Sequence, residues 1–206
     1  MIFDGGGRLA MPVGARDHML GPPSAPVTLV EYGDYECPYC GAAHPIVKEI
    51  RRRLGDQLCF VFRHFPLTAV HPHAEHAAEA AEAAGAQGKF WAMHDMLYEY
   101  QHALDDGHLV SYAEAIGLDL ERFAREMVAG IHALRVREDF LSGVRSGVNG
   151  TPTFFINGQR HNGSYELPTL LGAIAAAMAM TPVALSPPAR GGGRRSAAGR
   201  RARGRS

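Results

Sequence analysis

Cys37 and Cys40 stand where an apolar run ends and a helix-like pattern begins. Residues 27–32 are mostly β-branched and aromatic, which predicts a short buried strand. Pro38 suits the first turn of a helix, where its missing N–H group removes no hydrogen bond. The apolar spacing then predicts a helix over residues 38–54, so that Cys37 lies at the helix N-terminus.

A cysteine at a helix N-terminus is suited to nucleophilic chemistry. Free backbone N–H groups and the positive end of the helix dipole stabilise a thiolate, which lowers the thiol pKa below its ordinary value of roughly 8.5. Cys40 lies one helical turn beyond Cys37 and within reach of a disulfide. Such a pair can attack a disulfide, form a mixed disulfide and resolve it, with Cys37 attacking and Cys40 resolving. This chemistry needs no cofactor besides the redox-active disulfide itself.

The same C-x-x-C spacing also begins many zinc sites, which need two further ligands. Cys59 is the only other cysteine, and it lies in an apolar run, residues 58–63, that predicts a buried strand. His71, His73 and His76 are close in sequence, but no cysteine or carboxylate completes a convincing ligand set with them. We therefore predict no metal site and an inert, buried Cys59.

Four segments resemble the DsbA-like thiol:disulfide oxidoreductases of the thioredoxin superfamily, over roughly residues 15–180. They are VEYGDYECPYCG around the two cysteines, FRHFPL at 62–67, HPHAEHAAEAAEAAGAQGKFWAMHD at 71–95 and GVNGTPTFFING at 147–158. Between the cysteines, Pro38 and Tyr39 form the redox-tuning dipeptide, which is similar to that of glutaredoxins. On this basis we expect a reduction potential in the glutaredoxin range of roughly −200 to −230 mV.

The resemblance implies an α/β thioredoxin fold with a helical insertion domain, as in DsbA-like proteins. The chain then divides into an N-terminal arm, a thioredoxin-fold domain in two pieces, an inserted helical domain and a disordered Arg-rich tail. These parts are residues 1–20, 21–71 with 148–182, 72–147 and 187–206, respectively.

The residue patterns predict individual elements within this division, among them an edge strand over residues 9–13. Asn157-Gly158 predicts a tight hairpin, because both turn positions favour positive φ. Further strands are expected at 153–156 and 159–161, and helices at 74–86, 89–103, 109–116, 120–129, 131–144 and 167–180. In the second of these helices, the large apolar residues Phe90, Trp91, Met93 and Met96 are expected in the core, with a peptide-binding groove as the alternative.

Two further positions complete the predicted site. The resemblance implies that the Thr151-Pro152 bond is cis and faces the cysteines, where the Thr151 backbone pairs with a client strand. From the residues alone, an ordinary trans turn proline would be the favoured interpretation, because most X-Pro bonds are trans. Strand alternation places Glu31 beneath the helix, and the resembled family has an acid at the matching position. A buried Glu31 could accept the Cys40 proton, and the alternative is an exposed strand residue.

Charge is distributed unevenly along the 206 residues. The chain has 21 basic and 21 acidic residues, but residues 190–206 hold seven Arg and no acid. This tail predicts at most a weak, salt-sensitive contact with nucleic acid. Residues 1–20 lack a secretory h-region, and the apolar stretch at 170–180 is too short to span a membrane, so we expect a cytoplasmic protein without a membrane partner.

These observations favour a protein disulfide oxidoreductase that exchanges disulfides with protein thiols and is recycled by glutathione or another thiol reductant. One alternative is a glutathione-dependent isomerase or transferase on the same fold, although such proteins commonly lack the second cysteine. Another is a non-enzymatic adaptor that binds zinc or nucleic acid. The sequence leaves the direction of electron flow, the clients and the oligomeric state open.

Overall fold

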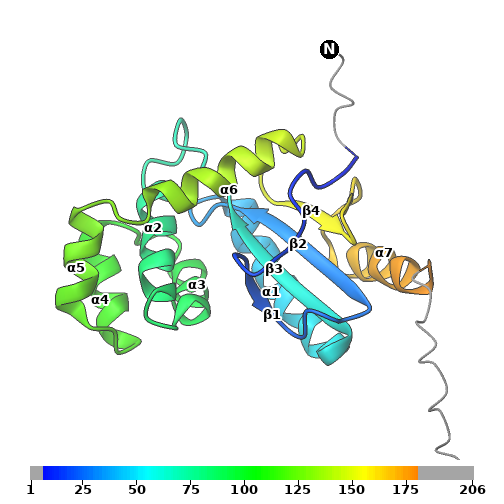
Figure 1. Cartoon of the computed structure of the whole chain (residues 1–206), viewed down its shortest axis with the longest axis horizontal. Coiled ribbons are helices and arrows are strands. Elements are labelled where there is room, and N and C mark those ends of the chain that lie inside the picture. The colour runs from blue at the N-terminus through cyan, green and yellow to red at the C-terminus, as the bar shows by residue number, and fades with distance from the viewer. Residues whose placement is uncertain (1–6, 181–206) are drawn as a thin grey trace, which may run out of the picture.

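Five strands form one sheet within residues 7–180, the part of the chain that the computed structural model describes (Figure 1). The strand order is β1-β3-β2-β4-β5, with β2 and β3 parallel and the other neighbours antiparallel. The strands are β1 (His18–Leu20), β2 (Val27–Gly33), β3 (Leu58–His64), β4 (Thr153–Ile156) and β5 (Gln159–Arg160). The central strand β2 thus ends directly before the two cysteines.

Helices cover both faces of this sheet and extend beyond one end of it (Figure 1). The helices are α1 (Pro38–Leu54), the short η1 (Gly55–Gln57), α2 (Ala74–Gly85), α3 (Phe90–Glu99), α4 (Asp106–Ala115), α5 (Leu120–Val128), α6 (Ala133–Arg145) and α7 (Leu167–Met180). The helices α1 and α7 pack on one face, whereas α6 packs against β3 from the other. The helices α2 to α6 lie between β3 and β4, in the range 72–147 predicted for the insertion, and the α/β thioredoxin-like fold is confirmed.

Alternation along the strands divides the apolar side chains between two clusters. Leu29 and Phe62 face α1, and their cluster continues without interruption into α2, α3, α4 and α5. Val30 and Val61 face the other way, towards a smaller cluster under α6. There, Phe140 of α6 stacks on Phe65 with ring centroids 4.5 Å apart. The helical insertion therefore shares its core with the face of the sheet that carries α1.

Most of the predicted elements are present with shifts of one to four residues. The hairpin is confirmed, since Asn157 and Gly158 have φ values of 47° and 77°. Asp119 caps α5 by accepting a hydrogen bond from the Arg122 backbone N–H. The helix α4 begins three residues earlier than predicted, because the Asp105 side chain accepts hydrogen bonds from the first-turn N–H groups.

The N-terminal segment differs from the prediction. Residues 9–13 form no strand, and the predicted edge strand there is wrong. The carbonyl oxygens of Met11 and Pro12 bind the Arg63 side chain instead of pairing in the sheet. The edge strand is β1, which pairs antiparallel with β3. Three residues are too few to give a recognisable alternation in sequence.

The core interpretation of the aromatic and methionine side chains in α3 is confirmed. Phe90 and Met93 are buried, and the half-buried Trp91 and Met96 pack against the same cluster. The Arg-rich tail and its predicted disorder lie outside the described residues. Within those residues, every helix is too short or too polar to cross a membrane.

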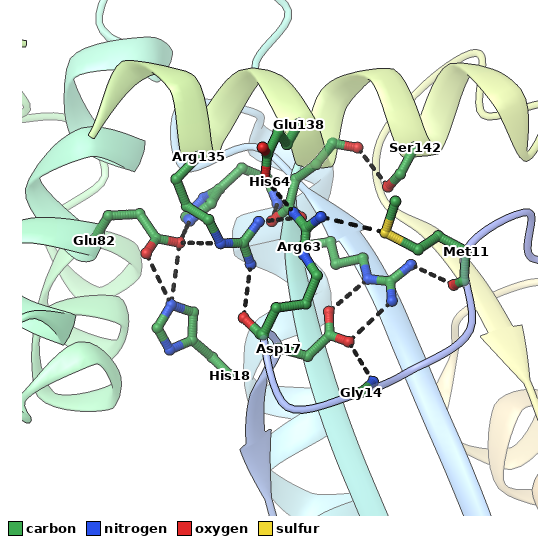
Figure 2. A network of polar contacts seen from close by, with 12 residues as sticks. Met11, Gly14, Asp17, His18, Arg63, His64, Glu82, Arg135, Glu138 and Ser142 are labelled. Carbon is green, nitrogen blue, oxygen red and sulfur yellow. Dashed lines mark hydrogen bonds and ion pairs between the residues drawn. The ribbon is translucent and has the colours of Figure 1, made fainter. Parts of the chain in front are cut away.

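A buried ion pair joins the N-terminal segment to the sheet (Figure 2). The side chains of Asp17 and Arg63 are fully buried, and Arg63 donates from Nε and Nη2 to the two carboxylate oxygens at 2.8 and 3.0 Å. The guanidinium also donates to the Tyr32 hydroxyl at 3.0 Å and to the Met11 and Pro12 carbonyls at 2.9 and 3.1 Å. These partners offset the cost of removing the charge from water.

A second set of charges joins the helical insertion to β3 (Figure 2). The Glu82 carboxylate of α2 bonds to His64 Nε2 at 2.9 Å and to His18 Nε2 at 3.0 Å. Burial would raise the pKa of Glu82, but the hydrogen bonds with these imidazoles hold it well below its usual range. In α6, Asp139 accepts the His64 backbone N–H at 3.2 Å and pairs with Arg135. The helices α2 and α6 are thereby fixed to the same strand.

We predict that Asp17→Ala destabilises the protein by about 3–5 kcal/mol, because it leaves a buried guanidinium without its counter-charge. The free energy of unfolding from urea titration of the reduced protein measures this loss. Glu49→Ala is the control, since it removes the exposed pairs with Arg52 and Arg53 and should leave the urea midpoint nearly unchanged. Equal losses in the two variants would contradict the importance of the buried pair.

Candidate active site

Cys37 occupies the N-cap position of α1, as predicted, and Pro38 is the first helical residue. The Cys37 backbone is extended, with φ −72° and ψ 120°, and no side chain caps the helix. The backbone N–H groups of Tyr39 and Cys40 act on the Cys37 sulfur instead and help to lower the pKa of the thiol. The first turn of α1 therefore directs its free donors at the sulfur atom.

The two thiols have opposite pKa shifts. A hydrogen bond with the Cys40 thiol is the main cause that lowers the pKa of Cys37 to about 5, against the opposing effect of burial. Burial raises the pKa of Cys40, and the hydrogen bond to Cys37 and the charge of Glu31 add to this. All three cysteines are free thiols in the structure. Near neutral pH the pair therefore combines a Cys37 thiolate with a protonated Cys40.

The loop before β4 faces these thiols. The Thr151–Pro152 peptide bond is cis, which confirms the geometry implied by the resemblance. The Thr151 carbonyl oxygen lies 3.4 Å from the Cys37 sulfur. Segments 114 residues apart in the chain thus meet at the reactive atom.

Glu31 lies on the α1 side of β2 and is 2 % exposed, so the buried alternative is the correct one. Its Oε1 has no hydrogen-bond partner among the described residues. Burial, followed by the charge of Cys37, raises the pKa of Glu31 to about 8. Because the charge of Glu31 also raises the pKa of Cys40, the three groups are electrostatically coupled.

Asp34 supports the turn between β2 and α1, a role that the sequence interpretation missed. Its carboxylate accepts the backbone N–H groups of Glu36 and Leu67, each at 2.8 Å, and bonds to His71 Nδ1 at 2.7 Å. An Asp between a strand and a helix was the available signal, because such residues commonly bond to nearby backbone. His71 is therefore a partner of this carboxylate.

The three histidines that are close together in sequence, His71, His73 and His76, do not share one set of partners. His71 pairs with Asp34, and His76 pairs with Asp106. Within residues 7–180, the groups of three side chains close enough to hold one metal ion are His44 with His94 and Asp95, and His64 with Glu82 and Asp139. Neither group contains a cysteine.

The dipeptide between the cysteines lies at the surface. Pro38 is exposed, and Tyr39 has 64 % of its surface accessible. Cys37, by contrast, is only 3 % exposed. The predicted redox-tuning residues are thus exposed, whereas the cysteine beside them is almost fully covered.

The comparison with family models matches residues 15–176 to a family described as thioredoxin. The chain belongs to this family. A thioredoxin-like oxidoreductase from Silicibacter pomeroyi has 30 % sequence identity and a TM-score of 0.71, over 80 % of this chain and 93 % of that one. Two solved structures under 25 % identical share the fold. BdbD from Bacillus subtilis has 23 % sequence identity and a TM-score of 0.74, over 84 % of this chain and 99 % of that one. The α-DsbA1 protein from Wolbachia pipientis has 22 % sequence identity and a TM-score of 0.72, over 83 % of this chain and 94 % of that one. The fold is that of DsbA-like thiol–disulfide oxidoreductases.

Curated relatives carry a different name. The chain is 51 % identical over 166 residues to Na(+)/H(+) antiporter NhaA 1 of Salinispora arenicola, covering 81 % of this chain and 25 % of that protein. It is 44 % identical over 160 residues to Na(+)/H(+) antiporter NhaA of Herminiimonas arsenicoxydans, covering 78 % of this chain and 25 % of that protein. The chain thus spans about a quarter of the length of these relatives.

The coupled titration of Cys37 and Glu31 predicts how the stability of the reduced protein depends on pH. The folded-state pKa of Cys37, about 5, is below its ordinary value of 9.0, so the folded state binds fewer protons and stability rises with pH through this window. The folded-state pKa of Glu31, about 8, is above its ordinary value of 4.5, so stability falls as pH rises through that window. The two effects oppose each other between about pH 5 and 8.

We therefore expect the stability of reduced Glu31→Gln to rise more steeply with pH than that of the wild type over this interval. Cys37→Ser should show the reverse, a fall in stability with rising pH. Urea midpoints at a series of pH values, under a reductant, measure both slopes. Parallel curves for wild type and Glu31→Gln would contradict the raised pKa of the buried carboxyl group.

Proposed function

We propose that the protein is a thiol:disulfide oxidoreductase that exchanges disulfides with protein clients through Cys37 and Cys40. The observation that carries this proposal is the position of Cys37 at the N-cap of α1 with Cys40 buried one turn further on, together with the opposite shifts of their pKa values. An attacking thiol must be ionised before reaction, whereas a resolving thiol must stay protonated until the mixed disulfide has formed.

In the reducing direction, the Cys37 thiolate attacks one sulfur of a client disulfide, and the other client sulfur leaves as a thiolate. Cys40 then loses its proton and attacks the Cys37 sulfur of the mixed disulfide. The second client sulfur leaves, and Cys37 and Cys40 are joined by a disulfide. Two electrons have passed from the pair to the client, and the reverse sequence oxidises a client dithiol.

We assign Glu31 as the acceptor of the Cys40 proton. The negative charge of Cys37 is one cause of the raised Glu31 pKa, and formation of the mixed disulfide removes that charge. Without that charge the Glu31 pKa is lower, so that a larger fraction of the Glu31 carboxyl groups is ionised when Cys40 must be deprotonated. The buried position of this side chain beneath α1 supports the assignment.

The Cys37 pKa supports an intermediate redox potential. Its value of about 5 lies between the values of roughly 7 for thioredoxin and 3.5 for DsbA. A more stable thiolate favours the reduced form and makes the disulfide more oxidising. We therefore propose a potential between roughly −270 and −120 mV, an interval that includes the glutaredoxin range.

We propose protein thiols and disulfides as the clients, and glutathione or another thiol reductant as the recycling partner. The Thr151 backbone beside Cys37 supports pairing with an extended client segment. A glutathione transferase or isomerase is less well supported, because Cys40 provides an intramolecular resolving thiol. The antiporter names describe proteins of which this chain matches only a quarter, so we propose redox chemistry and not ion transport for this chain.

We predict that Cys37→Ser reduces insulin disulfides in the presence of dithiothreitol no faster than the uncatalysed reaction, because the attacking thiolate is absent. Cys40→Ser should accumulate mixed disulfides with clients, visible on non-reducing gels, because no thiol resolves them. Cys59→Ala is the control, because Cys59 is buried in β3 and burial raises its pKa. A marked loss of insulin reduction in this control would contradict the assignment of the reaction to Cys37 and Cys40 alone.

A further inference from the structure

Gln101 lies in the turn that follows α3 and contacts the backbone around Cys37. Its Nε2 donates one hydrogen bond to the Tyr35 carbonyl oxygen at 2.8 Å and another to the Cys37 carbonyl oxygen at 2.7 Å. The side chain is half-buried, and it reaches the turn between β2 and α1 from the helical insertion, more than 60 residues away in sequence. One amide group therefore binds both ends of the tripeptide formed by residues 35–37.

The Cys37 carbonyl is part of the helix start. It accepts the Gly41 backbone N–H at 3.1 Å, the first hydrogen bond of α1, in addition to the Gln101 amide. The orientation of this peptide determines whether the N–H groups of Tyr39 and Cys40 point at the Cys37 sulfur. A group that fixes the carbonyl consequently acts on the thiolate, although it touches no sulfur atom.

The side chain of Tyr35 fixes the other end of the same tripeptide. Its hydroxyl is hydrogen-bonded to His94 Nδ1 of α3 at 3.0 Å, and the ring is fully buried. The Tyr35 side chain and carbonyl are thus both bound to the segment formed by α3 and Gln101. The turn is anchored to the insertion on this side, while Asp34 binds it to Leu67 and His71 on the other.

Gly41 provides the space for this amide. A Cβ atom added at Gly41 would lie 2.3 Å from Gln101 Oε1 and 3.0 Å from its Cδ, both closer than van der Waals contact. Glycine is unfavourable inside a helix, where alanine is preferred. The structure therefore gives a physical reason for glycine directly after Cys40, which is to leave room for the Gln101 side chain.

We propose that Gln101 is a positioning residue of the active site: it holds the start of α1 so that the N–H groups of this helix stabilise the Cys37 thiolate. The absence of a side chain at Gly41 leaves the space that the Gln101 side chain occupies. The proposal deepens the proposed function and rests on it for its biological meaning. Its chemical content concerns the ionisation of Cys37, which is measurable without any client.

The first test is Gln101→Met, which keeps the length of the side chain and removes both donors. We expect the pKa of Cys37, followed by thiolate absorbance at 240 nm, to rise. Because two hydrogen bonds are lost, the equilibrium with glutathione should shift towards the Cys37–Cys40 disulfide by about tenfold. A Cys37 pKa and glutathione equilibrium equal to those of the wild type would overturn the proposal.

Gln87→Met is the matched control. Gln87 also binds backbone, since it donates to the Asp119 carbonyl at 3.3 Å and accepts the Asp119 N–H at 2.8 Å. Both contacts lie inside the helical insertion and none involves residues 35–41. We expect this variant to leave the Cys37 pKa unchanged. An equal rise in both variants would show that general loosening of the insertion is the cause, and would overturn the proposal.

A double-mutant cycle tests the proposed role of Gly41. Gly41→Ala should displace the flexible end of Gln101 and raise the Cys37 pKa as Gln101→Met does, although alanine favours the helix. The double variant should then show the same pKa as either single variant, because the same contact is lost. Additive shifts, or a Gly41→Ala variant with a wild-type pKa, would overturn the role of Gly41.

These readouts separate the inference from the proposed function. If the wild-type protein fails to reduce insulin disulfides while Gln101→Met raises the Cys37 pKa, the positioning role stands and the proposed function fails. If insulin reduction is present and the pKa is unmoved, the proposed function stands and the positioning role fails.

Discussion

The stabilisation of a single negative charge on Cys37 is the interaction around which the structure is arranged. It requires that α1 begin directly after this residue, that Cys40 be buried one turn below as a donor, and that no side chain cap the helix. The central strand β2 brings the chain to this point, and the loop at Thr151 closes it from the opposite side. The surrounding contacts of Asp34 and Gln101 keep the short connection between strand and helix in one geometry.

The same charge limits what its neighbours can do. Glu31 and Cys40 lie in a region where a second negative charge is unfavourable, and burial raises the pKa of each. The three groups therefore exchange protons as a unit. The first step of disulfide exchange removes the thiolate charge and so changes the proton affinity of the other two groups. The covalent state of the Cys37 sulfur is thus coupled to the protonation of Glu31 and Cys40.

The sequence was sufficient to predict the parts of the structure that depend on local pattern. Cys37 at a helix start and the Asn157–Gly158 turn follow from residue types within a few positions of each other. The meeting of Thr151 with Cys37 was expected only from the family resemblance, and other contacts between distant segments were missed. The amide of Gln101 and the carboxylate of Asp17 have no sequence pattern that points to their partners, since each pairs with groups 46 to 66 residues away. Buried polar groups find partners through the tertiary fold, and one sequence does not show which.

The placement of the insertion between β3 and β4 has a consequence for how the polypeptide is made. The central strand β2 and its neighbour β3 are both synthesised before the insertion, but the other neighbour of β2, β4, follows only after the whole insertion. Glu31 of β2 pairs in register with Phe154 of β4, across most of the described chain. Until β4 has been synthesised, the edge of β2 that pairs with it has no partner, and an unpaired strand edge can pair with another chain. The sheet around the active-site strand therefore depends on the last part of the domain for its completion.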